Sequence, residues 1–255
     1  MLKKILPLTC LCASIFAAEE GESYKSVEKG KHKIAFYGWL PAIDADSTVD
    51  GGTAPIDFSA KDVFDNAEGA VFTRYEYLSP DNIGYYADFQ WVNITGDTTE
   101  GPLGVDADIE QITADLGAFY RLNLRDGAFF DAMLGIRYVD LKQKVDVDGP
   151  GPGPTKNLGG SEDWLEPVIG ARLGIPMTET LTFLLRGDYG GFGVGSAADK
   201  NYNVVVATEW AFDEQWSTIL GWKYNYLDYS RGSGNDEFGF DGSFAGVIAA
   251  ITYSF

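Results

Sequence analysis

The closing segment of the chain, Gly239–Phe255 (GFDGSFAGVIAAITYSF), decides the fold. From Val247 onward, one alternate set of residues is apolar or aromatic, namely Val247, Ala249, Ile251, Tyr253 and Phe255. The other set is mixed, namely Ile248, Ala250, Thr252 and Ser254. Side chains alternate between the two faces of a strand, so a period of two predicts a β-strand that ends at an aromatic residue.

Similar runs precede this strand, and the segments that separate them are alternately long and short. The pattern predicts about ten strands, at 34–48, 70–78, 83–95, 108–122, 128–144, 165–175, 181–193, 202–212, 217–229 and 239–255. Within the long separator 50–69, Ser59-Ala60-Lys61-Asp62 predicts the capped start of a short helical turn. An even number of strands with short turns at one end and longer loops at the other is the pattern of a membrane β-barrel. The expected fold is therefore all-β, a single antiparallel up-and-down transmembrane barrel.

Charged residues occupy the middle of these strands, on the alternate set opposite the aromatic one. An Arg or Lys that faced lipid near the midplane would cost about 2–4 kcal/mol, so this set is predicted to point into the barrel. Its near balance of signs predicts an internal network of ion pairs that largely fills the lumen. The predicted members are Arg74, Glu76, Asp88, Asp115, Arg137, Glu166, Arg172, Arg186, Asp188, Glu209 and Lys223.

Aromatic residues near the strand ends distinguish a membrane barrel from a soluble barrel, whose apolar residues would line the interior instead. Rings with one polar and one apolar edge suit the headgroup level of a bilayer. The predicted aromatic girdle contains Tyr75, Tyr77, Tyr85, Trp91, Tyr120, Tyr138, Trp210, Trp222, Tyr224, Tyr253 and Phe255.

The beginning of the chain and its charge indicate export. Residues 1–18 have Lys3 and Lys4, then a short apolar run and small residues, which predicts a secretory signal peptide. Residues 19–33 are predicted to form a mobile arm, and 34–255 the barrel. Both cysteines, Cys10 and Cys12, fall within the signal, so no disulfide is expected. Loss of two lysines would change the net charge from −19 to about −21, which argues against nucleic acid as a partner.

Several segments resemble stretches of small Gram-negative outer-membrane β-barrel proteins of the OmpA and OmpW types. They are the closing strand with Tyr253 and Phe255, and the segments 37–42 (YGWLPA), 164–172 (WLEPVIGAR) and 186–193 (RGDYGGFG). The resemblance implies an integral outer-membrane location, contact with lipid and lipopolysaccharide, and recognition of the C-terminal strand by the barrel-assembly machinery. It also implies roles in membrane integrity, adhesion or passage of small solutes.

No catalytic pattern stands out. The ten-strand count resembles omptin proteases, but their Asp-His pattern is missing from the loop-side strand ends, and the single histidine, His32, precedes the first predicted strand. No cofactor or metal is expected, although acidic outer ends such as Asp44, Asp46 and Asp50 leave divalent bridging to lipopolysaccharide as an alternative to solvated loops. The expected function is a non-enzymatic barrel with a structural or surface-interaction role. The alternative is a narrow porin or transporter for a small solute or hydrophobic compound.

Overall fold

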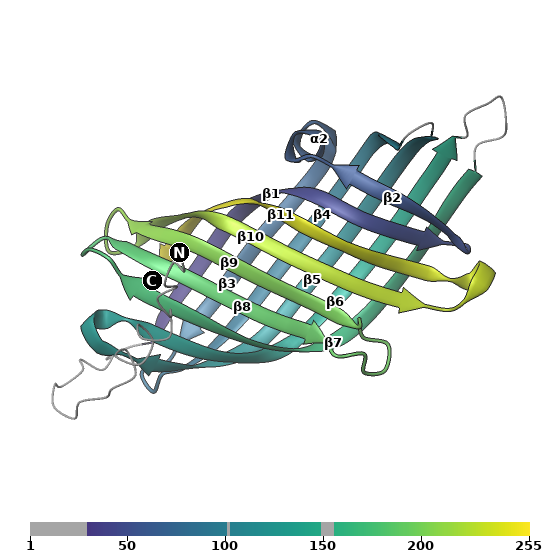
Figure 1. The fold of residues 1–255 in the computed structure, drawn as a ribbon. Coiled ribbons are helices and arrows are strands. Elements are labelled where there is room, and N and C mark those ends of the chain that lie inside the picture. Colours follow the sequence, from purple (N-terminus) through teal and green to yellow (C-terminus); the bar gives the residue numbers. More distant parts are fainter. Residues whose placement is uncertain (1–29, 101–102, 149–155) are drawn as a thin grey trace, which may run out of the picture.

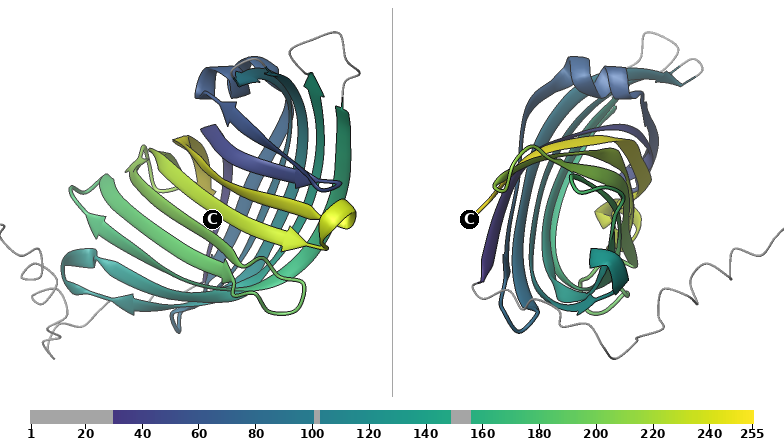
Figure 2. Two further views of the ribbon diagram at one scale, coloured as in Figure 1. Left: turned by 45° about the vertical axis from the view of Figure 1, so that its right-hand side comes forward. Right: turned by 90° about the vertical axis from the view of Figure 1, so that its left-hand side faces the viewer.

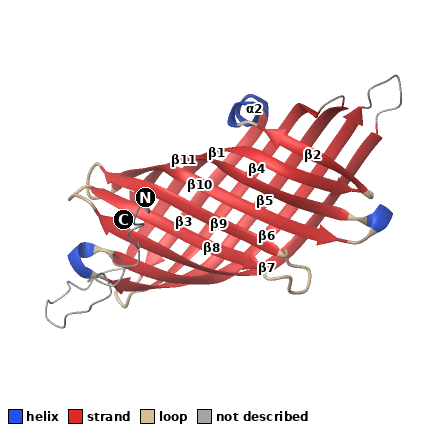
Figure 3. Cartoon of the chain, viewed as in Figure 1, coloured by secondary structure: helices blue, strands red, loops and turns tan. Residues whose placement is uncertain are grey.

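The computed structural model describes residues 30–100, 103–148 and 156–255. The predicted signal peptide, and residues 19–29 of the predicted arm, lie outside the described residues. Nearly all of the described chain is strand (Figure 3). The elements are β1 (Lys31–Val49), β2 (Gly52–Phe58), α2 (Ala60–Asn66), β3 (Ala67–Leu78), β4 (Ile83–Glu100), β5 (Leu103–Asn123), η1 (Arg125–Gly127), β6 (Phe129–Asp148), β7 (Lys156–Pro176), β8 (Leu181–Gly191), β9 (Lys200–Ala211), β10 (Trp216–Arg231), η2 (Gly234–Asp236) and β11 (Phe238–Ser254).

The sheet closes on itself as an antiparallel barrel. β11 pairs with β1 along its whole length, from Lys33 opposite Ser254 to Val49 opposite Phe238. From β3 onward, each strand pairs with the next one along the chain. Ten strands form the wall, and β2 is an additional short strand that pairs only with β1. The predicted up-and-down barrel of about ten strands is confirmed.

The two ends of the barrel differ, and we name them by their connections. At the turn end lie the short turns 79–82, 124–128, 177–180 and 212–215. The two described chain termini are also there, where the His32 N–H donates to the Phe255 carbonyl at 2.9 Å. The opposite, loop end is drawn at the right of Figure 1, and its rim is slanted because β4–β7 are longer than β8 and β9 (Figures 1 and 2). None of the described helices is long and apolar enough to cross a membrane.

The predicted strand bounds need correction at the loop end. β5, β6 and β7 span 21, 20 and 21 residues, so much of what the sequence suggested as loop continues as paired strand. About 9–11 residues suffice for a strand to span a bilayer. Strands of this length are therefore about twice as long as a bilayer requires.

Two predictions about the first third of the chain also change. β1 begins at Lys31, so residues 31–33 belong to the barrel and not to the arm. The long separator after β1 contains β2 and α2, of which only the helix was predicted. Ser59 caps α2 as expected: its hydroxyl accepts from the Asp62 N–H, and the Asp62 carboxylate accepts from the Ser59 N–H at 2.9 Å. The Ser59 hydroxyl also donates to the Asp62 carboxylate at 2.5 Å, and this hydrogen bond, together with the one from the Ser59 N–H, holds the pKa of Asp62 below its usual range.

The apolar core lies inside the loop-end half of the barrel. On β6, Val139, Leu141 and Val145 are fully buried, and they pack in one cluster with Trp164 of β7 and Phe240 of β11. In the same half, the outward set on β6 is charged, with Asp140, Lys142 and Lys144. The loop-end half is thus built like a water-soluble barrel, apolar inside and charged outside.

Candidate functional site

The turn-end half of the lumen contains the predicted charged residues, and Arg137 of β6 lies at their centre. Its Nε donates to Asp115 Oδ1 of β5 at 2.8 Å, and its Nη2 donates to Asp188 Oδ1 of β8 at 2.8 Å. Glu166 of β7 is 3.6 Å from Nη1 and also accepts from Trp164 Nε1 at 2.9 Å. All four charged side chains are buried, so the guanidinium offsets a carboxylate on each side of it.

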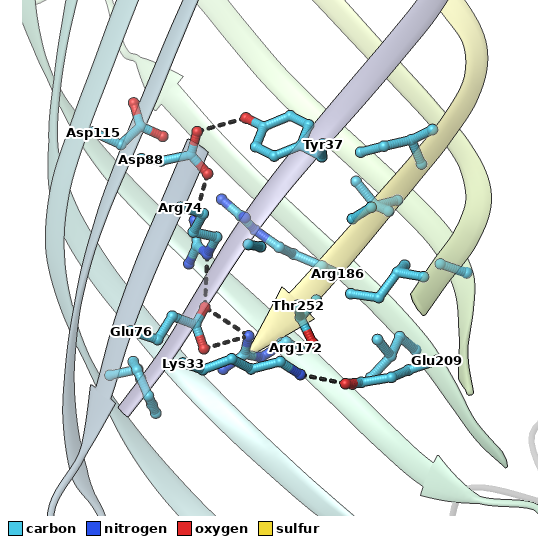
Figure 4. A pocket seen from close by; sticks show the side chains of 18 of the residues that line it. Lys33, Tyr37, Arg74, Glu76, Asp88, Asp115, Arg172, Arg186, Glu209 and Thr252 are labelled. Carbon is cyan, nitrogen blue, oxygen red and sulfur yellow. Dashed lines mark hydrogen bonds and ion pairs between the residues drawn. The ribbon is translucent and has the colours of Figure 1, made fainter. Parts of the chain in front are cut away.

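A second group of ion pairs lies nearer the turn end. Arg74 of β3 bridges Glu76 at 2.6 Å and Asp88 at 2.9 Å, as Figure 4 shows. Glu76 in turn accepts from Arg172 Nη1 of β7 at 2.8 Å across the lumen. Arg172 also pairs with Asp131 of β6 at 2.8 Å. In such a series of linked ion pairs, each buried charge has an opposite charge beside it, as ions removed from water require.

Three members of this network were missed by the sequence analysis. Arg121 of β5 forms a two-bond pair with Asp131, at 2.7 and 2.8 Å. Lys33 pairs with Glu209 of β9. Arg121 and Asp131 share the alternate set of Asp115 and Arg137, so the same periodicity could have found them, whereas Lys33 was assigned to the arm. With them, the network has seven basic and seven acidic side chains: Lys33, Arg74, Arg121, Arg137, Arg172, Arg186 and Lys223, and Glu76, Asp88, Asp115, Asp131, Glu166, Asp188 and Glu209.

Inward glycines make room in this half for aromatic rings. A Cβ on Gly84 would lie 2.1 Å from the Phe119 ring, and one on Gly174 would lie 2.2 Å from Phe129. The rings in turn support the cations: the Arg121 guanidinium lies 3.8 Å from the centre of the Phe129 ring. The glycines therefore admit flat rings on which arginines stack.

A cavity of about 350 Å³ remains in the turn-end half of the lumen. It extends from Lys31 and Ser254 at the turn end to Arg137 and Lys223. Figure 4 shows its charged lining, with Arg186 reaching between Tyr37 and Arg74. The lining does not include the buried cluster of the loop-end half, which lies beyond Arg137.

The outer face of the turn-end half is apolar. Leu134 and Ile136 of β6 are 65% and 52% exposed, which in water would be unfavourable for such a continuous surface. All predicted girdle residues lie on this outward set, and several of them, including Tyr85, Tyr120, Trp210 and Trp222, are exposed. Their contact with lipid headgroups stays a prediction.

His32 lies on this outer face and not in a polar arm. Its ring stacks on Phe255 at 5.1 Å between centres, and its Nδ1 is 2.7 Å from the Tyr75 hydroxyl. It is at the turn end of the barrel. Among the described residues, no three histidine, cysteine or carboxylate side chains converge as a set that could hold a metal ion.

No family model matches this sequence, and no curated protein matches it. Solved structures do. The outer-membrane protease OmpT from Escherichia coli aligns with 92% of this chain and 99% of its own, at 10% identity and a TM-score of 0.51. This chain has the fold of an outer-membrane β-barrel. The apolar outer belt and the charged lumen agree with that fold, which is the fold of integral outer-membrane proteins.

Two further structures align with lower scores. The translocator domain of the autotransporter NalP from Neisseria meningitidis covers 97% of this chain, with 93% of its own, at 12% identity and a TM-score of 0.44. The attachment protein Ail of Yersinia pestis covers 90% of this chain, with 100% of its own, at 13% identity and a TM-score of 0.37.

Proposed function

We propose that this chain is a non-enzymatic outer-membrane barrel with a closed lumen, and that it acts through its surface. The observation that supports this most is the buried cluster in the loop-end half. Phe58 of β2, Leu141 of β6, Trp164 of β7 and Phe240 of β11 are each at most 2% exposed, and they meet inside the barrel. A water-filled path needs polar lining along its whole length, and this cluster interrupts it.

The ion-paired half strengthens the argument. A conducting lumen usually presents one sign of charge to the passing ion. Here the seven basic and seven acidic side chains are largely paired with each other, as Arg137 is with Asp115 and Asp188. The charges therefore link strands of the wall to one another.

Surface interaction is proposed through the outer face of the loop-end half. That face carries charged side chains on paired strands, such as Asp44 and Asp46 of β1, Asp140 of β6 and Asp241 of β11, with fewer lysines among them. Rigid strands hold these charges at fixed spacing. We infer contact with lipopolysaccharide, directly or through divalent cations, and recognition of β11 by the assembly machinery.

Proteolysis, the activity that OmpT is named for, is not proposed for this chain. Acid–base catalysis by an Asp-His arrangement needs an imidazole close to the reacting groups. The one histidine of this sequence is at the turn end, where it contacts Tyr75 and Phe255 on the outer face.

Conductance in planar bilayers tests the proposal. The purified barrel should give no steady ionic current at modest voltage, while a porin inserted in the same bilayer gives steady steps. A steady, ohmic current through the wild-type barrel would overturn the closed lumen and favour the second candidate, a narrow porin.

A further inference from the structure

The barrel wall is interrupted between β1 and β3. β1 pairs with β3 only over Lys31–Phe36, and with β2 only over Ile43–Val49. Residues 37–42 of β1 have a strand partner on the β11 side alone. On the facing edge, residues 67–72 of β3 pair with β4 alone. The two edges diverge toward the loop end, and the wedge between them is bounded there by α2, which contacts β1 and β4 and adds Val63 to the buried cluster of the loop-end half (Figure 1).

The wedge lies within the apolar belt. Its β1 edge is in register with Val247 and Ala249 of β11, and both of these face outward beside Leu220 and Trp222 of β10. An open sheet edge in hydrocarbon leaves N–H and C=O groups unpaired, which is tolerated only where these groups are buried in protein or line a water-filled cavity. Pro41 lies on the edge and has no N–H to leave unpaired, in keeping with the preference of proline for edges.

A cavity of about 120 Å³ lies at this interruption. It is lined by apolar side chains from both edges and from α2: Leu40, Pro41, Phe64, Ala67 and Ala70, together with Phe72, which faces the lumen and is buried. Ala70 belongs to the inward set of β3 and is nevertheless exposed, and Phe64 of α2 is 71% exposed. The gap in the wall is therefore wide enough for an acyl chain to pass from the bilayer to the interior of the barrel.

The inner end of the same cavity is polar. Gln90, Asn203, Lys223 and Asn225 line it. The Lys223 ammonium is buried, donates to Gln90 Oε1 at 3.0 Å and lies 3.9 Å from the centre of the Trp39 ring. Unlike the other six basic members of the network, Lys223 forms no ion pair with any described residue. Trp39 Nε1, in the same lining, has no hydrogen-bond partner there either. A buried cation with donor capacity to spare fits an anionic group.

We propose that this wedge is a binding site for a single-chain amphiphile with a carboxylate head, of the long-chain fatty acid class. The molecule enters sideways from the bilayer between β1 and β3. Its carboxylate accepts from Lys223 and from Trp39 Nε1, while its first methylene groups contact Leu40, Phe72 and the α2 side chains. The rest of the chain stays in the bilayer. This site does not depend on whether the lumen conducts.

Calorimetric titration of dodecanoate and dodecanol into the barrel in lipid nanodiscs tests the proposal, with empty nanodiscs subtracted. The wild-type barrel should bind dodecanoate saturably at one site at pH 8. Lys223→Met, which leaves no carboxylate without its ion-pair partner, should weaken dodecanoate about tenfold or more and change dodecanol binding little, because it removes a charge-assisted hydrogen bond. Ala70→Trp, which fills the wedge, should abolish binding of both ligands.

Ala132→Trp is the matched control, since it adds the same ring at an outward position of β6. It should bind like the wild type. Heat-modifiability on a gel verifies that each variant is folded, and Ala70→Leu replaces Ala70→Trp if the latter does not fold. The proposal is overturned if the wild type shows no saturable binding above empty nanodiscs, or if Lys223→Met or the folded Ala70 variant binds dodecanoate as the wild type does.

Discussion

The two halves of this barrel place apolar side chains on opposite faces of the wall: outside in the turn-end half and inside in the loop-end half. On β6, the turn-end half has Leu134 and Ile136 outside and Arg137 inside, whereas the loop-end half has Lys142 outside and Leu141 inside. On β11, Ile251 faces outward in the turn-end half, whereas Phe240 and Phe244 face inward in the loop-end half. The backbone and its alternation continue unchanged across the boundary. What changes is the solvent outside the wall: lipid accepts apolar side chains on the outer face, and water does not.

The comparison also shows why the lumen charges can be retained. With lipid outside, hydrophobic burial inside the turn-end half gains little over exposure to the bilayer, so ion pairs and rings can fill it. In the loop-end half, water outside makes an apolar interior favourable, as in a soluble protein. If this interpretation holds, mutations should have different consequences in the two halves.

Removal of Arg137 should have the largest effect. Arg137→Met would leave Asp115 and Glu166 buried without their ion-pair partner and Asp188 with Arg186 alone, which costs about 3–5 kcal/mol of the free energy of unfolding. The matched variant Lys142→Met, on the same strand as Arg137, breaks an exposed pair with Glu110 of β5 and should cost less than about 1 kcal/mol. Urea unfolding in lipid vesicles measures both. Equal losses would contradict the assignment of the network to the interior.

Truncation of the loop-end core should come next. Leu141→Ala removes a fully buried side chain from the apolar cluster, and we expect a loss of about 2–5 kcal/mol. Because no lipid contacts this part, the loss should be similar in vesicles and in detergent micelles. A loss that disappeared when the bilayer was replaced by detergent would place Leu141 against lipid and disprove the inversion.

The outer face offers a third comparison, along a single strand. Leu134→Arg should cost about 2–4 kcal/mol, because it puts a charge in the apolar belt. Asp140→Arg introduces the same side chain three outward positions farther toward the loop end, where the face is already charged, and should change stability by about 0.5 kcal/mol or less. Should the two variants unfold at the same urea concentration, the boundary of the belt would have to lie elsewhere.

The smallest effect concerns α2, beside the wedge. Ser59→Ala removes the cap of α2 and should cost about 1 kcal/mol locally, seen as faster hydrogen exchange in peptides that cover 59–66. The pKa of Asp62 is lower in the folded protein than the ordinary value of 3.8. The stabilisation that its ionised carboxylate contributes to the cap is therefore fully present above pH 3.8 and is lost as the pH falls through the lower folded pKa. The difference between wild type and Ser59→Ala should therefore shrink at strongly acidic pH. A difference that is independent of pH would exclude a role for the Asp62 carboxylate.

Periodicity was enough to predict which residues share a face. It placed Arg137, Asp188 and Lys223 inside and Tyr120 and Trp222 outside, because alternation in a strand is a local property of the backbone. It did not predict partners. Arg172 meets Glu76 across 96 residues of sequence, and that contact depends on the register and closure of the whole barrel.

By itself, the sequence determined the strands, their number to within one short strand (β2), and the two faces of the wall in the belt. Only the tertiary structure decided where the belt ends, because the strands continue with the same period while the polarity of the faces is reversed. The tertiary structure alone also decided that β2 and α2, and not β3, lie beside the loop-end part of β1. The edges at 37–42 and 67–72 are left open by that arrangement, and a missing neighbour leaves no trace in a local pattern.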